Sequence, residues 1–229
     1  MDYPYVPLPQ REPLRWPGGA HVALIVTFNL ETWDLLKDTD QPYYAGGPAL
    51  LPNTLPGNVA DFPNYSWREY GQRVGLWRMF EAMDDFDVKP SCTLNAVTVE
   101  RRRAMLDAAL ARGCEIVAHN YEQGELLTDY MFEPEKERDV VLRTLEVYEQ
   151  AVGRKARGWL SSSLRGTPYT PSILAEQGCI FYCDIMNDDQ PFLIRTDNGP
   201  IVSVPYSNEI NDFTLVTRRG HSTDEVRDI

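Results

Sequence analysis

The sequence predicts a single α/β domain whose mostly parallel strands form a barrel or a barrel-like sheet. Short apolar runs alternate with amphipathic segments of helical length along most of the chain. Strands that alternate with helices at this spacing pair in parallel through right-handed crossovers. A chain of 229 residues with 43% hydrophobic content can bury one good core. We therefore expect one barrel domain in residues 20–229, preceded by an N-terminal arm in residues 1–19.

The N-terminal third combines an arm, a strand and a long irregular segment. Residues 1–19 are rich in proline and polar groups and are expected on the surface. Residues 21–28 form a continuous apolar, β-branched run, which predicts a strand buried on both faces. Residues 34–63 have many Pro, Gly, Asn and Asp residues without a period, so we expect a functional or disordered loop there.

Four segments have helical periodicity: residues 69–83, 99–112, 134–153 and 170–178. In the first, apolar residues recur every three to four positions from Tyr70 to Phe80, which places them on one face. Gly113 follows the second helix as a stop, and Pro134 suits the first position of the third. Five further strands are predicted at residues 91–94, 114–118, 156–160, 180–183 and 200–205.

Polar residues follow each predicted strand. They are Asn29 and Glu31, Asn95, His119, Ser161 to Ser163 with Arg165, Asp184, and finally Tyr206, Glu209, Asn211 and Asp212. Parallel strands bring such residues to one rim, where these folds build catalytic pockets. Each member alone has a structural alternative: His119 as a hydrogen-bonded core histidine, Glu31 as the partner of an arginine, and the serines as a capping turn.

Composition and charge restrict the partners and the compartment. The net charge of −12 disfavours nucleic acid and anionic membranes. No stretch approaches the ~20 apolar residues of a membrane helix, and the N-terminus has no secretory pattern, so we expect a cytoplasmic protein. Four cysteines without CxxC spacing predict reduced, buried thiols rather than disulfides or a zinc site.

Five ordered segments resemble the polysaccharide deacetylase superfamily, within its allantoinase-like and cyclic-imidase-like branch. They are residues 27–31, 69–78, 113–121, 158–159 and 204–212, with Glu-Tyr-Gly-x-Arg-x-Gly and Pro-Tyr-x-x-Glu-x-Asn-Asp as the most specific. The resemblance implies a distorted (β/α) barrel of six to eight mostly parallel strands. It also implies hydrolysis of a carbon–nitrogen bond that is not a peptide bond.

The sequence departs from the family's metal pattern at three positions. The resemblance implies an aspartate base, an aspartate ligand and two histidines in H-x-x-x-H, whereas this chain has Asn29, Glu31 and, after His119, Gln123. Such a set has lost charge and a strong donor, so we expect no metal, or at most a weakly held zinc or other divalent ion on Glu31 and His119. The branch is thought to work without an essential metal, which favours a small cyclic amide over an acetylated polysaccharide.

The expected roles follow from the chemistry of amide hydrolysis. We expect His119 and Glu31 to share proton transfer and Asn29 to orient the water or the substrate carbonyl. The expected substrate-binding residues are Trp159, Arg165, Tyr206, Asn211 and Asp212, with Glu69 and Arg73 as either site residues or a buried ion pair.

Two other functions stay open. The chain could be a metal-dependent N-deacetylase of a polysaccharide or small molecule, or a non-catalytic member that binds a ligand. The family usually continues to a last strand with a further histidine, whereas residues 218–229 look like another helix. We therefore expect a barrel without its C-terminal elements. The branch also suggests a homo-oligomer.

Overall fold

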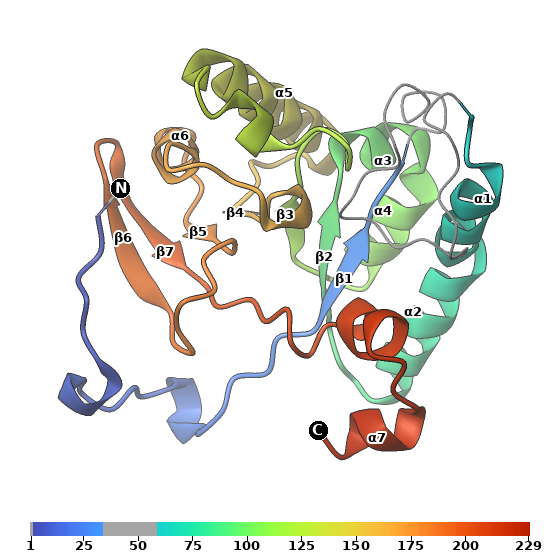
Figure 1. The fold of residues 1–229 in the computed structure, drawn as a ribbon, viewed down its shortest axis with the longest axis horizontal. Coiled ribbons are helices and arrows are strands. Elements are labelled where there is room, and N and C mark those ends of the chain that lie inside the picture. The colour runs from blue at the N-terminus through green and yellow to red at the C-terminus, as the bar shows by residue number, and fades with distance from the viewer. Residues whose placement is uncertain (1, 34–58) are drawn as a thin grey trace.

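A curved, mostly parallel sheet forms the centre of the protein in a computed structural model that describes residues 2–33 and 59–229. The sheet has seven strands in the order β1-β2-β3-β4-β5-β7-β6. Helices α2, α4, α5 and α6 follow one another along the sheet (Figure 1). The expected α/β class and strand number are confirmed, although the sheet does not close on itself among the described residues.

The strands are short and are covered by helices. They are β1 (Thr27–Leu30), β2 (Ser91–Leu94), β3 (Ile116–Ala118), β4 (Gly158–Trp159), β5 (Phe181–Tyr182), β6 (Phe192–Thr196) and β7 (Gly199–Ser203). Strand β6 alone of these pairs antiparallel, with β7. The carboxyl ends of the parallel strands therefore meet at one rim, as the crossover rule requires.

Most helices connect consecutive strands. They are α1 (Phe62–Tyr70), α2 (Leu76–Asp85), α3 (Ala96–Arg101), α4 (Arg103–Ala111), α5 (Pro134–Val152), α6 (Thr170–Glu176) and α7 (Thr223–Arg227). Short turns of helix lie at η1 (Leu8–Gln10), η2 (Pro17–Gly19), η4 (Gly71–Gly75), η5 (Leu127–Tyr130), η6 (Ser162–Leu164) and η7 (Phe213–Arg218). None of the helices in these ranges is long and apolar enough to cross a membrane.

The first strand is shorter and more exposed than predicted. Residues 21–28 were expected as a strand buried on both faces, but β1 begins at Thr27. Val22 and Leu24 before it are 78% and 81% exposed. The reason is that β1 lies at the edge of the sheet and pairs only with β2 among the described residues, so nothing in that part of the chain covers the preceding run.

The antiparallel strand β6 was not predicted from the sequence. It forms a hairpin with β7 through Asp197 and Asn198, and Gly199 has a positive φ of 112°. An Asn-Gly pair between two β-forming runs is a strong hairpin signal and could have revealed this strand. The N-terminal arm reaches the same hairpin, because the backbones of Asp2 and Arg195 hydrogen bond to each other.

Two predicted helices differ from the structure in detail. The expected helix 69–83 belongs to a longer run in which α1 and α2 are joined by the π-helical turn η4. A π turn shifts the register of the side chains, so Leu76 and Phe80 face the core while Tyr70 is exposed. The expected helix 99–112 is two helices that meet at Arg102, whose φ of −131° and ψ of 45° are not helical.

Two predicted helices and the reduced cysteines are confirmed. Helix α5 begins with Pro134 and ends before Gly153 at φ 78°, and α6 ends before Gly178 at φ 86°. The four cysteines are free thiols. Burial raises the pKa of Cys179 and of Cys183 to about 12, so both thiols are neutral at pH 7.

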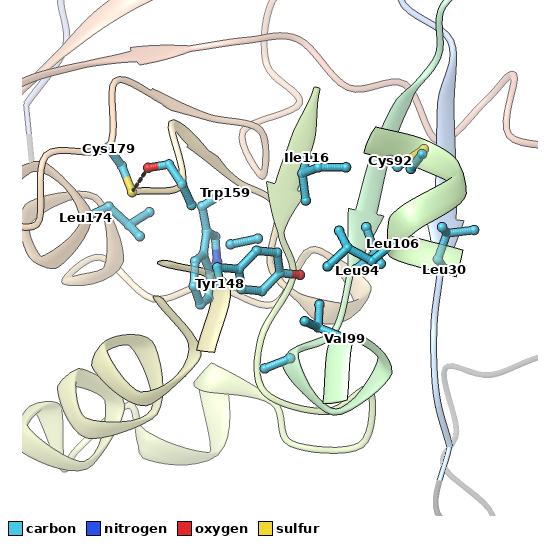
Figure 2. Close-up of a cluster of buried hydrophobic side chains, with 14 of the residues drawn as sticks. Leu30, Cys92, Leu94, Val99, Leu106, Ile116, Tyr148, Trp159, Leu174 and Cys179 are labelled. Carbon is cyan, nitrogen blue, oxygen red and sulfur yellow. Dashed lines mark hydrogen bonds between the residues drawn. The ribbon is translucent and has the colours of Figure 1, made fainter. Parts of the chain in front are cut away.

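Large side chains from the strands and from α5 fill the core. Figure 2 shows Trp159 and Tyr148 beside Leu94 and Ile116, with the Cys179 thiol bonded to a backbone carbonyl. This packing fixes the strands whose ends carry the polar residues. Of the long loop predicted at residues 34–63, positions 34–58 lie outside the described residues, and helix α1 begins at Phe62.

Candidate active site

A cavity of about 380 Å³ opens at the carboxyl ends of the strands. Its walls combine two carboxylates, an imidazole, amides, hydroxyls and two guanidinium groups. The lining residues are Asn29, Glu31, Trp33, His119, Gln123, Leu160, Ser161, Ser163, Leu164, Arg165, Tyr206, Asn208, Asn211, Asp212, Phe213 and Arg218. Most of the strand-end residues predicted at the rim therefore line one cavity, whereas Asn95, Ser162, Asp184 and Glu209 do not.

His119 follows β3 and is only 2% exposed. Its Nδ1 lies 2.6 Å from the carbonyl oxygen of Leu160. Because a carbonyl only accepts, Nδ1 carries a proton, and in the neutral form of this ring the lone pair is on Nε2. Nε2 makes no hydrogen bond to the described residues and lies 3.5 Å from the Glu31 carboxylate. A fixed imidazole thus presents an unpaired nitrogen beside a carboxylate at the cavity wall.

Asn29 and Asn211 orient a tyrosine that also lines the cavity. Thr93 donates to the Asn29 amide oxygen at 2.9 Å, and the Asn29 amide nitrogen donates to the Tyr206 hydroxyl at 3.2 Å. Asn211 donates to the same hydroxyl at 3.1 Å. Burial raises the pKa of Tyr206, so its hydroxyl stays protonated at pH 7. With two bonds accepted, that hydroxyl keeps its own proton to donate.

Glu31 is held through its backbone by a chain of polar contacts from α1 and η4. Gln72 donates to the Glu31 carbonyl at 2.5 Å, and Arg102 donates to Gln72 at 3.2 Å. Arg102 also pairs with Glu69 at 3.1 Å. The expected pairing of Glu69 with Arg73 is wrong, because Arg73 is exposed on the π turn and Arg102 takes its place. Neither Glu69 nor Arg73 lines the cavity.

Asn95 is a buried hub behind the cavity. Its amide oxygen accepts the backbone N–H of Thr32 at 3.0 Å. Its amide nitrogen donates to the backbone carbonyl of His119, and lies within hydrogen-bond reach of Gln123 at 3.3 Å and Ser162 at 3.4 Å. These contacts tie the segments after β1, β3 and β4 together.

The loop after β4 also lines the cavity, and its backbone is strained. Ser163 and Leu164 both have positive φ, 56° and 59°, which non-glycine residues seldom adopt. Such strain persists where the surroundings hold it, often at functional sites. Trp159, expected to contact substrate, is instead fully buried and donates to the Ser161 hydroxyl at 2.9 Å. It supports this loop from the core.

The described residues alone do not make up a divalent-metal site. No group of three or more His, Cys, Asp or Glu side chains gathers in the described part of the chain. Gln123, at the position of the family's second histidine, is buried, and its amide oxygen accepts from Ser162 at 3.0 Å. Glu31 and His119 alone supply fewer donors than zinc sites ordinarily use.

Several contributors to the site were given no catalytic or binding role from the sequence. Arg218 and Asn208 line the cavity. Gln72, Asn95 and Asp184 support it from behind. Asn95 and Asp184 follow β2 and β5, so the strand-end pattern contained them. The role of Gln72 could not be predicted from the sequence, because it depends on a tertiary contact between a helical turn and the Glu31 backbone.

Comparison with known proteins gives several similar proteins. No family model matches the chain. A protein of Schizosaccharomyces pombe named "Putative polysaccharide deacetylase" is 23% identical over 90% of this chain and 69% of its own length. Puue allantoinase has a crystal structure with TM-score 0.79 and 25% identity, covering 94% of this chain and 72% of the allantoinase.

Two further crystal structures extend the comparison. One, described as a probable polysaccharide deacetylase from Pseudomonas aeruginosa PAO1, has TM-score 0.77 and 25% identity, covering 90% of this chain and 69% of its own. The other, from Mycobacterium smegmatis, has TM-score 0.74 and 24% identity over 90% of this chain. The present chain spans 65% of that second structure. By sequence and fold, the chain is a relative of the polysaccharide deacetylases, in a group that includes an allantoinase.

Proposed function

We propose that this chain hydrolyses a carbon–nitrogen bond of a small cyclic amide or imide, of the allantoin, hydantoin or imide type, without a resident metal. The observation that carries the proposal is His119, whose Nδ1 is fixed by Leu160 and whose unpaired Nε2 lies 3.5 Å from Glu31 in the cavity. An imidazole held in one tautomer beside a carboxylate is suited to general acid–base catalysis. The relatives named as deacetylases and an allantoinase support the same reaction type.

His119 begins the reaction as the base. Its Nε2 takes a proton from a water molecule while the water oxygen bonds to the carbonyl carbon of the substrate. Glu31 stabilises the imidazolium that forms, because a negative charge at this distance favours the protonated ring. Asn29, whose position is fixed by Thr93 and Tyr206, orients the water or the substrate carbonyl.

Collapse of the tetrahedral intermediate breaks the carbon–nitrogen bond. The imidazolium returns its proton to the leaving nitrogen, so His119 ends neutral and one water molecule is consumed. The product has a new carboxyl group. Arg165 and Arg218 line the cavity, and their guanidinium groups stabilise the oxyanion and this carboxylate. The backbone N–H groups of Ser161 and Ser162 do not serve here, because they already donate to Asp184 and Asn120. Tyr206, Asn211 and Asp212 bind the polar edge of the ring.

The direct test compares His119→Ala with His221→Ala on allantoin, hydantoins and succinimide. His221 lies outside the cavity and provides the same side-chain change as a control. We expect loss of at least ~100-fold in kcat/KM for His119→Ala, the usual contribution of a general base. Unchanged turnover in that variant would remove His119 from the chemistry.

The second candidate is a metal-dependent N-deacetylase, favoured by the names of three relatives. It requires Glu31 and His119 to hold a divalent ion with ligands from outside the described residues. Elemental analysis of the purified protein, and turnover before and after chelation, distinguish the two. A stoichiometric ion, with activity lost to a chelator and restored by zinc, would favour this candidate and contradict the first.

We further propose a homo-oligomer in the cytoplasm that acts on a small molecule and has no nucleic acid or membrane partner. The net charge of −12 supports the absence of polyanionic partners. Light scattering during gel filtration measures the oligomeric state directly.

A further inference from the structure

The peptide group between Leu160 and Ser161 connects His119 to a second carboxylate. The carbonyl of this peptide accepts the His119 Nδ1 proton at 2.6 Å. Its N–H, on Ser161, donates to Asp184 at 2.7 Å. One planar amide thus has an imidazole at its oxygen and a carboxylate at its nitrogen.

Asp184 is held rigidly against this peptide. Its second carboxylate oxygen accepts the Tyr182 hydroxyl at 2.8 Å. Gly166 packs over both groups, because a Cβ atom there would lie 2.1 Å from the Tyr182 hydroxyl and 2.6 Å from Asp184. Only glycine fits at this position without displacing the carboxylate.

Both neighbours of Asp184 are donors, so their contacts suit its ionised form. Burial raises the pKa of Asp184, and the bonds from Ser161 and Tyr182 lower it. The charge of a protonated His119 also lowers the pKa of Asp184, so the two groups lie within electrostatic reach of each other.

Building on the proposed function, we propose that Asp184 is a positioning residue that fixes the tautomer and orientation of His119 through the Leu160–Ser161 peptide. A carboxylate at the N–H polarises the amide and makes its carbonyl a stronger acceptor, because hydrogen bonds in a chain strengthen one another. The stronger acceptor keeps the proton on Nδ1 and leaves Nε2 as the base. Asp184 itself does not line the cavity.

The test is nuclear magnetic resonance of protein labelled with ¹⁵N-histidine, which reports the protonation of each ring nitrogen. The chain has three histidines, so His21 and His221 serve as internal references for His119. The wild type is expected to show His119 protonated on Nδ1 only. Asp184→Asn keeps the shape and an oxygen acceptor but removes the charge. In the Asp184→Asn variant, we expect the Nδ1 proton of His119 to resonate further upfield. We also expect the chemical shifts of its two ring nitrogens to move closer together, because the two tautomers are both populated.

Asp189→Asn is the matched control, because Asp189 is exposed and its change removes the same charge. It is expected to leave the His119 resonances unchanged. Tyr182→Phe removes one donor to Asp184. It should shift the His119 resonances in the same direction as Asp184→Asn does, but by a smaller amount. If Asp184→Asn does not fold, Tyr182→Phe serves as the test in its place. The proposal is overturned if the His119 resonances are unchanged in a folded Asp184→Asn variant. If that variant does not fold, unchanged resonances in Tyr182→Phe overturn it. The resonances are measured without substrate. A negative result for Asp184 can therefore be told apart from a failure of the proposed hydrolase activity.

Discussion

At the scale of single residues, buried amides hold the reacting groups in place. Asn95 is fully buried and binds backbone atoms of Thr32 and His119. Asn95→Ala is expected to lower the free energy of unfolding by about 2–4 kcal/mol, because it leaves two buried backbone groups unpaired. Urea denaturation measures this loss. Asn208→Ala, at an exposed cavity residue, should stay within about 0.5 kcal/mol of wild type, and an equal loss in both variants would contradict the role of Asn95.

The site residues differ in how far sequence could predict them. Glu31, His119, Tyr206 and Asn211 were predictable because strand ends of a parallel sheet meet at one rim. The tautomer of His119 was not, since it depends on a carbonyl 41 residues away in the chain. Trp159 was misplaced for a related reason: its position near the rim does not reveal whether the side chain faces the cavity or the core.

At the scale of elements, a buried carboxylate joins α5 to the start of α6. Glu137 on α5 is fully buried and accepts the hydroxyls of Thr167 at 2.6 Å and Thr170 at 2.5 Å. Burial raises the pKa of Glu137, so the folded chain retains this proton to higher pH than the unfolded chain. Stability of the wild type must therefore fall as pH rises from the unfolded pKa through the folded one.

Glu137→Gln removes this dependence. The stability of the variant relative to wild type should increase between pH 4 and 7, by about 1.4 kcal/mol for each unit by which the folded pKa is raised. Glu176→Gln is the control with the opposite sign, because Arg138 lowers the pKa of Glu176 on the surface. Urea denaturation across this range tests both, and a constant difference for Glu137→Gln would refute the assignment.

The contact between β4 and β5 requires glycine at position 158, because there is no room for a side chain there. A Cβ atom on Gly158 would lie 1.9 Å from the ring of Phe181, its partner in the sheet. Gly158→Ala is expected to destabilise the fold by roughly 3 kcal/mol, as over-packing does. Adding Phe181→Leu should recover part of the loss in thermal or urea unfolding. Gly71→Ala, in an open helical position, should be neutral or stabilising; no recovery in the double variant would argue against the ring contact.

Elements with strong local signals were predictable, and those set by tertiary contacts were not. Both ends of helix α5 were predicted correctly, because Pro134 is a local start signal and Gly153 a local stop signal. The exposed run before β1 has the same composition as a buried strand, and only the absence of a described neighbour on that side distinguishes it. Arg102, where the predicted helix 99–112 breaks, contacts Glu69 and Gln72 in a distant part of the sequence, and no local pattern reports these contacts.

At the scale of the whole molecule, the cavity is built from segments that span most of the chain, from Asn29 to Arg218. A ligand that bridges these segments binds the folded state and not the unfolded one. It must therefore raise the unfolding temperature, by an amount that grows with the logarithm of the ligand concentration above the dissociation constant. This property distinguishes a cavity that binds cyclic amides from one that does not.

A cyclic amide or imide at ten times its dissociation constant should stabilise the protein by about 1.4 kcal/mol, which raises Tm by roughly 3–6 °C for a chain of this size. Differential scanning fluorimetry with allantoin, hydantoin and succinimide measures the shift. Asn211→Ala should reduce it, because Asn211 lines the cavity and orients Tyr206. Gln150→Ala, on the exposed face of α5, should leave it unchanged. If no cyclic amide raises Tm at millimolar concentration while the protein remains folded, the cavity does not take this class of ligand.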